Sequence, residues 1–344
     1  MHMADALISP AVGGVMWAAS AGLIGYSAKK VREEADDRKI PLMGVLGAFI
    51  FAAQMINFSI PATGSSGHLG GGMILAILLG PYAAFLVMAS VLVVQALFFA
   101  DGGLLTLGCN MFNLGFFPCF IAYPLIYRKI AGDHPSQRKI ILGSVIAAVV
   151  GLQLGAFGVV METVLSGVSE LPFRAFVLLM QPIHLAIGVV EGLVTACVVN
   201  FVWKARPEIL ETKERAASIG KIEMKKMLSG LAVAAVIIGG ALSWFASSNP
   251  DGLEWAMSKV SGKEELENNA GAHASLARFQ EKTAFLPDYG FKDSAAGAGS
   301  AAGETTKWPS IDPGTSVSGL VGGVLVLSMV ALIGLALKRR RNAI

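Results

Sequence analysis

Residues 69–99 read LGGGMILAILLGPYAAFLVMASVLVVQALFF, a run without a single charged side chain. One membrane-spanning helix needs only about 20 apolar residues, so this run is too long for a single crossing. It contains Gly80-Pro81, a pair typical of turns. We therefore predict a short helix near 69–79, followed by a full crossing near 82–99. A short helix at membrane depth is tolerated where it lines a cavity inside the protein.

The composition of the whole chain is that of a membrane protein. Of its 344 residues, 54% are hydrophobic and only 15% are charged, with a mean hydropathy of +0.63. Soluble globular domains carry about 25% charged residues. Further apolar spans are expected near 9–28, 41–58, 108–127, 140–165, 173–203, 227–246 and 317–337.

Basic segments fix the expected topology. They lie at 29–39, 128–139, 204–226 and 338–341, and the positive-inside rule places all of them in the cytoplasm. An odd number of crossings must then lie between the second helix and the second basic segment, and the split at Gly80-Pro81 supplies it. The sequence predicts an all-α integral membrane protein with seven helices up to Trp203, followed by two more. The N-terminus is expected outside and the C-terminus in the cytoplasm.

Several function classes are disfavoured by what the sequence contains. The net charge of +3 is small, which argues against a nucleic-acid partner. Cys109, Cys119 and Cys197 lie far apart in apolar stretches, so neither a disulfide framework nor a zinc site is indicated. The start has no basic residue before Lys29, unlike a cleaved signal peptide. No phosphate-binding loop is present, so any ATP hydrolysis must come from other subunits.

The strongest candidate for chemistry is a histidine at position 2, in the opening stretch MHMADALISPAVGG. A terminal amine, the His2 backbone nitrogen and the His2 imidazole can bind one ion through fused five- and six-membered rings. This arrangement places three nitrogens in one plane, which suits Ni(II) or Cu(II). It requires a free amine on Met1, which we expect to be retained because the second residue is large.

His68 is the natural fourth donor. It lies in SIPATGSSGHLGGG, whose glycines suit a backbone folded tightly into a cavity rather than a membrane helix. Both His68 and His2 are expected on the outer side of one bundle. The metal site predicted from the residues therefore consists of Met1, His2 and His68.

Other ionisable residues are weaker candidates. His184 and Glu191 lie two turns apart on one face of the span 173–203, and such groups inside a membrane helix are functional candidates by default. The alternative is a buried polar pair that fixes helix packing. His134 and His273 are expected to be ordinary surface residues.

Residues 1–210, through their start motif and the GSSGHLGGG loop, resemble the CbiM/NikM family. This family comprises the substrate-binding components of nickel and cobalt energy-coupling-factor (ECF) ABC transporters. The resemblance implies a seven-helix domain whose N-terminus is tucked into the bundle and whose metal is bound by Met1, His2 and His68. It also implies partners, a transmembrane scaffold (T) subunit and ATPase (A) subunits, and a multi-pass location in a bacterial inner membrane.

The C-terminal part resembles a second component of these importers. ASSNPDGLEWAMSKV is similar to the PDGLE segment of the small two-helix N component, NikN-like, and here it is fused behind a cytoplasmic linker at 211–226. Residues 227–344 are expected to form a two-helix module with a loosely structured outer segment at 247–316. Asn249 or Asp251 could cap a helix there. We expect this module to serve transport rather than metal binding.

The interpretation is a high-affinity importer component whose transported substrate is Ni²⁺ or Co²⁺, with cobalamin biosynthesis as one use of the latter. The alternative is a secondary transporter or channel that works alone. That alternative would require a row of intramembrane acids, and only Glu162 and Glu191 lie well inside the spans. An enzyme is disfavoured because no nucleophile is paired with a base. A copper protein is disfavoured because the 14 methionines form no dense clusters.

Overall fold

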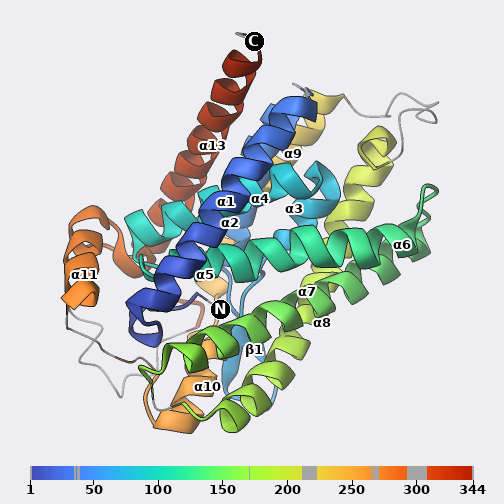
Figure 1. The fold of residues 1–344 in the computed structure, drawn as a ribbon. Coiled ribbons are helices and arrows are strands. Elements are labelled where there is room, and N and C mark those ends of the chain that lie inside the picture. Colours follow the sequence, from blue (N-terminus) through green and yellow to red (C-terminus); the bar gives the residue numbers. More distant parts are fainter. Residues whose placement is uncertain are drawn as a thin grey trace.

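A computed structural model describes residues 2–34, 36, 39–169, 171–210, 223–264, 266, 271–292 and 308–342. The chain is almost entirely helical, and its long helices cross one another in a single bundle (Figure 1). The principal helices are α1 (Pro10–Glu34), α2 (Lys39–Gln54), α3 (Gly72–Leu79), α4 (Pro81–Val94), α5 (Leu107–Met111), α6 (Arg128–Ala131), α7 (Gln137–Ser166), α8 (Phe173–Ala205), α9 (Met224–Gly240), α10 (Gly252–Ser261), α11 (Gly271–Thr283) and α13 (Pro313–Asn342).

The predicted break at Gly80-Pro81 is confirmed. Helix α3 ends at Leu79 and α4 begins at Pro81, with Gly80 between them at φ 81°. That backbone conformation favours glycine, and proline is favoured at the first position of a helix because it has no N–H to leave unpaired. All eight residues of α3 are buried, so this short helix is surrounded by protein rather than lipid.

Six helical stretches are long and apolar enough to cross a membrane. They are Pro10–Glu34, Pro81–Phe99, Leu107–Ala131, Gln137–Ser166, Phe173–Ala205 and Pro313–Arg340. Three segments expected to cross are shorter, because α2 has 16 residues, α3 has eight and α9 has 17. Leu107–Ala131 includes a π-helical turn region at Phe112–Tyr127, where Pro118 and Pro124 cannot donate backbone hydrogen bonds.

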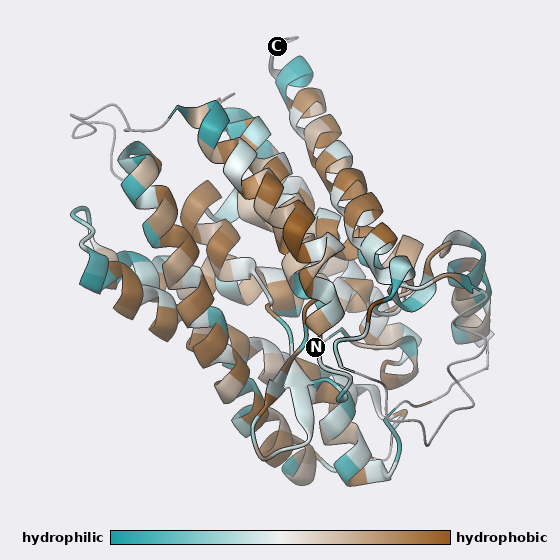
Figure 2. Cartoon of the chain, turned by 180° about the vertical axis from the view of Figure 1, so that it is seen from behind, coloured by the Kyte–Doolittle hydropathy of each residue, from teal (hydrophilic) through white to brown (hydrophobic). Residues whose placement is uncertain are grey.

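The helices differ in how much of their apolar surface the protein covers. In the most apolar window of Pro81–Phe99, 78% of residues are buried, whereas the corresponding fractions are 17% for α1 and 22% for Pro313–Arg340. Hydrophobic residues run along the long helices (Figure 2), and large apolar side chains such as Val15 and Leu332 are exposed on them. Helix α4 is therefore central, and α1 and α13 present apolar side chains to the surroundings, as expected in a lipid bilayer.

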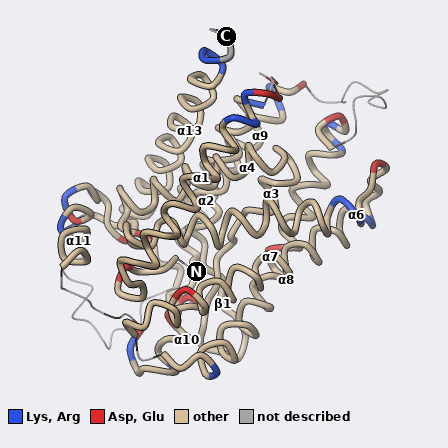
Figure 3. Tube along the Cα trace, in the orientation of Figure 1, with Lys and Arg blue, Asp and Glu red and all other residues tan. Residues whose placement is uncertain are grey.

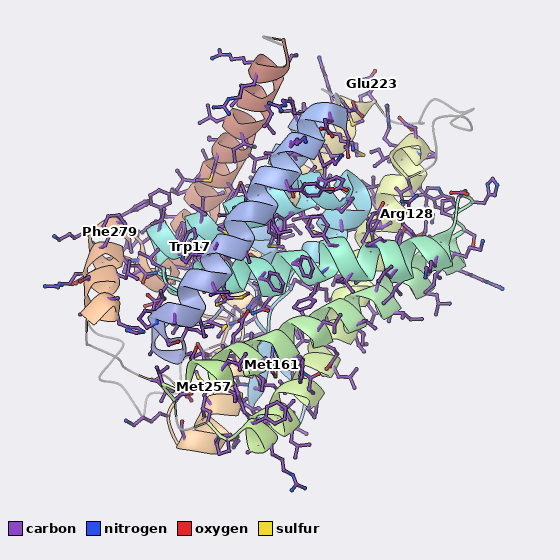
Figure 4. The ribbon with its side chains drawn as sticks, viewed as in Figure 1. Trp17, Arg128, Met161, Glu223, Met257 and Phe279 are labelled. Carbon is purple, nitrogen blue, oxygen red and sulfur yellow. The ribbon has the colours of Figure 1, made fainter. Side chains whose placement is uncertain are left out.

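Charged residues gather at the ends of the bundle (Figure 3). The C-terminal ends of α1 and α13 and the helix α6 lie toward one end, and α10 and α11 lie toward the other. Figure 4 shows Arg128 and Glu223 on the first side and Met257 and Phe279 on the second. Three of the basic segments predicted to share a compartment are thus on the same side of the molecule.

Two expectations are corrected. The fold is not purely α, because Phe58–Ile60 (β1) and Ser65–Gly67 (β2) form an antiparallel hairpin with Ser59 opposite Ser66. The segment 247–316 is not loosely structured where it is described, since it contains α10 and α11. Helix α10 begins with a capping box between Asp251 and Glu254, which stabilises its first turn.

Candidate metal site

The first described residues thread into the bundle and are anchored there. Met3, Leu7 and Ile8 are at most 1% exposed. The Met3 N–H donates to Asn110 Oδ1 at 2.9 Å, and the Thr106 hydroxyl donates to the Met3 carbonyl at 2.6 Å. These bonds satisfy the backbone of Met3, which precedes the short 3-10 helix Asp5–Leu7 and belongs to no helix or strand itself. The preceding histidine is therefore held inside the protein.

The two histidines predicted to share a metal site lie together. The rings of His2 and His68 stack with centroids 5.0 Å apart and planes 5° apart. Their side chains are only 8% and 7% exposed. Met1, the third predicted member, lies outside the described residues. The structure thus brings together two side chains that are 66 positions apart in the sequence.

Hydrogen bonds define which ring nitrogen of His68 can bind an ion. Its Nδ1 lies 3.1 Å from the carbonyl oxygen of Leu69, and a carbonyl only accepts, so Nδ1 carries the proton. The lone pair of neutral His68 is then on Nε2, which lies 3.9 Å from Asp251 Oδ2. A protonated Nδ1 held by a backbone carbonyl is the usual arrangement of a metal-binding imidazole.

The His2 ring has a different partner. Its Nδ1 lies 3.1 Å from Asp101 Oδ1, and its Nε2 is buried without a hydrogen-bond partner among the described residues. Burial lowers the pKa of His2 below its ordinary value and lowers the pKa of His68 to about 3. Both rings are therefore neutral at physiological pH, which is the form that binds metal ions.

Glu191 fixes the backbone that follows His68. Its two carboxylate oxygens accept hydrogen bonds from the N–H groups of Gly70 and Gly71 at 3.0 and 3.1 Å. The side chain of Gln54 donates to the Gly70 carbonyl at 2.8 Å. The glycine-rich turn is thus held by side chains from α2 and α8. These contacts position His68 just before the N-terminal end of α3.

Substitution of Gly71 by alanine should disrupt this turn. Gly71 has φ +78°, and an added Cβ would lie 2.7 Å from Ile50 Cγ2. Gly64 has φ +74° but open space around it, so Gly64→Ala is the matched control. We expect destabilisation of about 1 kcal/mol for Gly64→Ala from the backbone alone, and about 3 kcal/mol for Gly71→Ala from backbone and clash together. Thermal denaturation in detergent measures both, and equal midpoints would show that the turn has room to adjust.

The remaining histidines have distinct environments. His184 is 1% exposed, and its Nδ1 donates to the Met180 carbonyl at 2.8 Å. It lines a small cavity together with His68 and Asp251, whereas Glu191 binds the glycine turn, so the two side chains have different partners in the structure. His134 is exposed as expected. The prediction for His273 is wrong.

His273 is 6% exposed, and its Nε2 donates to the Ile8 carbonyl at 2.9 Å. The sequence placed it in a polar outer segment, but the helix that carries it packs against the anchored N-terminal segment. A single hydrogen bond between residues so far apart in the chain produces no pattern in the sequence around either residue.

Three residues at the site were not predicted as part of it. Asp101 and Asp251 face the two imidazoles from different parts of the chain. The Tyr289 hydroxyl donates to Asp101 Oδ2. Asp251 had a local signal as a possible helix cap, and it does cap α10, but nothing in the sequence indicated its distance from His68.

Side chains alone do not complete a metal site. Across the described ranges, no group of three or more His, Cys, Asp or Glu side chains is arranged to hold an ion. Two stacked imidazoles supply two nitrogens, whereas metal sites in proteins commonly use four or more donors. Any further nitrogen donors at this position would have to come from the backbone or from outside the described residues.

Comparison with known proteins identifies the family of the chain. Residues 2–209 match the family model described as CbiM, Cobalt uptake substrate-specific transmembrane region, and residues 225–339 match the PDGLE domain. A putative fused nickel transport protein NikMN from Archaeoglobus fulgidus is 33% identical over 341 residues, covering 98% of both chains. The cobalt transport protein CbiM of Geobacter sulfurreducens is 29% identical and covers 61% of both. A crystal structure titled as a transition metal transporter superposes with a TM-score of 0.53 at 32% identity, covering 60% of this chain and 95% of that one.

The fold and the relatives define a multi-pass membrane protein of the transition-metal transport class. The chain belongs to the CbiM family of nickel and cobalt transport proteins, with a PDGLE domain fused behind the CbiM region.

Proposed function

We propose that this chain captures Ni²⁺, or Co²⁺, with high affinity and carries it across the membrane as the substrate-binding component of an ATP-driven ECF importer. The ion is the transported substrate and not a resident cofactor. Its partners are a transmembrane scaffold subunit and separate ATPase subunits. The relatives that match this chain are named as nickel and cobalt transport proteins, which supports the choice of substrate.

The single observation that carries the proposal is the stacked pair of His2 and His68 at the end of a buried, anchored N-terminal segment. The amine of Met1 and the backbone nitrogen and imidazole of His2 would supply three nitrogens, and His68 the fourth. The six-membered chelate ring uses His2 Nδ1, which here lies beside Asp101. A half-turn of the ring about the Cβ–Cγ bond would exchange its two edges and present Nδ1 to the ion.

Nickel is the preferred substrate of the two. Four nitrogens in a plane suit Ni(II), and the Irving–Williams order places nickel above cobalt for a given set of ligands. A relative that matches this chain over nearly its whole length is named as a putative nickel transport protein. The same donors would also hold cobalt, which accounts for a family that contains proteins of both names.

The proposed topology keeps the seven crossings of residues 1–210 and the two of residues 227–344, joined by a linker at 211–226. Its support is the shared location of the basic ends of α1 and α13 and of α6 (Figure 3). The N-terminus and α10 and α11 would then face outward, and the C-terminus would face the cytoplasm. In this topology the ion enters beside α10 and is bound on the outer side of the bundle.

The test is nickel-dependent ATPase activity. The chain would be co-purified with the scaffold and ATPase subunits encoded beside its gene and reconstituted in lipid vesicles. We expect ATP hydrolysis to be stimulated by Ni²⁺ outside the vesicles and to be accompanied by nickel uptake. Nickel uptake by vesicles that contain this chain alone would instead support a secondary transporter.

A further inference from the structure

The PDGLE segment of the C-terminal module sits directly on the hairpin that leads to His68. The Ser66 N–H donates to the Pro250 carbonyl at 2.8 Å, and the Ser66 hydroxyl donates to the Asn249 carbonyl at 2.8 Å. The Trp255 indole N–H donates to the Thr63 carbonyl at 3.0 Å. These three bonds join positions more than 180 residues apart, and they fix the start of α10 against the loop of the candidate site.

This docking brings a carboxylate to the donor atom of His68. The Oδ1 atom of Asp251 caps α10 by accepting from the N–H groups of Leu253 and Glu254 at 2.7 and 3.0 Å. Its other oxygen, Oδ2, lies 3.9 Å from His68 Nε2. The Asp251 side chain is only 14% exposed, so its charge is poorly screened by water. The Asp251 carboxylate thus has two roles. One oxygen caps the N-terminus of α10, and the other faces the His68 imidazole.

The same module reaches the other imidazole through Tyr289. The Tyr289 hydroxyl donates to Asp101 Oδ2, while Asp101 Oδ1 lies 3.1 Å from His2 Nδ1. The Tyr289 ring stacks on Phe99 with centroids 5.1 Å apart, which fixes the direction of its hydroxyl. Gln280 of α11 donates to the Gly102 carbonyl at 2.7 Å, next to Asp101. The C-terminal module therefore holds the loop that carries Asp101.

The placement of the two carboxylates has an electrostatic consequence. A doubly charged ion bound by one deprotonated amide and neutral nitrogens keeps a net positive charge. Such a charge in a buried place is costly unless opposite charges lie close to it. Asp101 comes from the CbiM region and Asp251 from the PDGLE domain, and both face the imidazoles.

We infer that the C-terminal module completes the metal site, with Asp251 and Tyr289 acting as positioning residues that slow release of the ion. Asp251 holds negative charge at His68. Tyr289 fixes the carboxylate of Asp101 next to the His2 ring, so that its charge stays close to the ion after the half-turn of the ring has moved Nδ1 away from it. This rests on the proposed function of His2 and His68. It differs from the expectation that the module serves transport alone, because residues of the module contact both halves of the site.

The test measures release of nickel from the full-length protein. Nickel-loaded protein is mixed with excess chelator, and the dissociation rate constant is followed by the absorption of bound nickel. Asp251→Asn removes the charge and keeps a good helix cap, since Asn and Asp cap equally well. We expect Asp251→Asn to release nickel 10–100-fold faster, by analogy with residues that support metal ligands from outside the ligand set, where losses of about 10–100-fold are typical. Tyr289→Phe keeps the stacked ring and should also release nickel faster.

Controls separate this inference from the function on which it rests. Glu264→Gln removes an exposed charge of the same module and should leave release unchanged. Asp251→Ser retains a capping oxygen without charge, so it should behave as Asp251→Asn if the charge matters. Unchanged release by Asp251→Asn and Tyr289→Phe, in an assay where His2→Ala loses nickel, would overturn the inference alone. A wild-type protein that binds no nickel would instead overturn the proposed function.

Discussion

Replacing His2 with alanine should weaken nickel binding by ~1,000-fold or more, which corresponds to about 4 kcal/mol. The substitution removes the imidazole that closes the six-membered chelate ring and also the ring that stacks on His68. The fold should survive, because Met3 remains anchored by Asn110 and Thr106. Isothermal calorimetry on the purified protein gives the affinity, and thermal denaturation checks that the variant is folded.

Two other histidine variants test whether the loss of binding is specific to His2. His68→Ala should weaken binding less than His2→Ala, because water can take the fourth position whereas nothing replaces a broken chelate. His134→Ala changes an exposed histidine and should bind like the wild type. The chelate at the N-terminus is excluded if folded His2→Ala binds nickel as tightly as the wild type.

Extending the N-terminus by one glycine should be nearly as harmful as losing His2, with binding weakened by ~100-fold or more. The amine of Met1 becomes an amide, and the histidine moves to the third position. A chain with histidine third can still bind nickel in solution through a longer chelate. Here there is no room for one, because Met3 is fully buried and its backbone is bonded on both sides.

The matched control is a tag after Ile344, at the other terminus. Binding and transport should tolerate this tag, since the C-terminal end of α13 lies at the opposite end of the bundle from the N-terminus (Figure 1). Uptake of nickel by cells that make each version beside the other subunits provides the second measurement. An N-terminally extended protein with full uptake and full affinity would mean that the terminal amine is not a ligand.

Local features of the fold could be predicted from the sequence. The break between α3 and α4 follows from Gly80-Pro81, because the conformational limits of these two residues act within the chain itself. The long apolar helices follow from composition and length in the same way. The burial of α3 is consistent with its eight residues, which are too few to cross a bilayer.

The hairpin before His68 left little trace in the sequence. Strands of three residues are too short to show a pattern of alternating polarity. The sharp turn between them is visible only as Gly64 among small polar residues. The glycines indicated a tight backbone, but its partners, Gln54 and Glu191, lie on distant helices.

The sequence predicted the two histidines of the candidate site, His2 and His68. It did not predict that carboxylates lie beside them. His2 stood out because its place in the chain has its own chemistry, and His68 because of the glycines around it. Asp251 reaches His68 only because α10 docks on the hairpin, a contact across more than 180 residues. Tyr289 and His273 are similar, since each contacts the N-terminal half through tertiary packing alone.

The most direct test of the central claim is X-ray absorption spectroscopy of the full-length protein loaded with one equivalent of Ni²⁺. We predict four nitrogen donors in a square plane, with the outer-shell scattering of two imidazoles. His68→Ala should lose one imidazole and keep the plane. Six oxygen and nitrogen donors around the nickel, or scattering from no imidazole, would contradict a site built on His2 and His68.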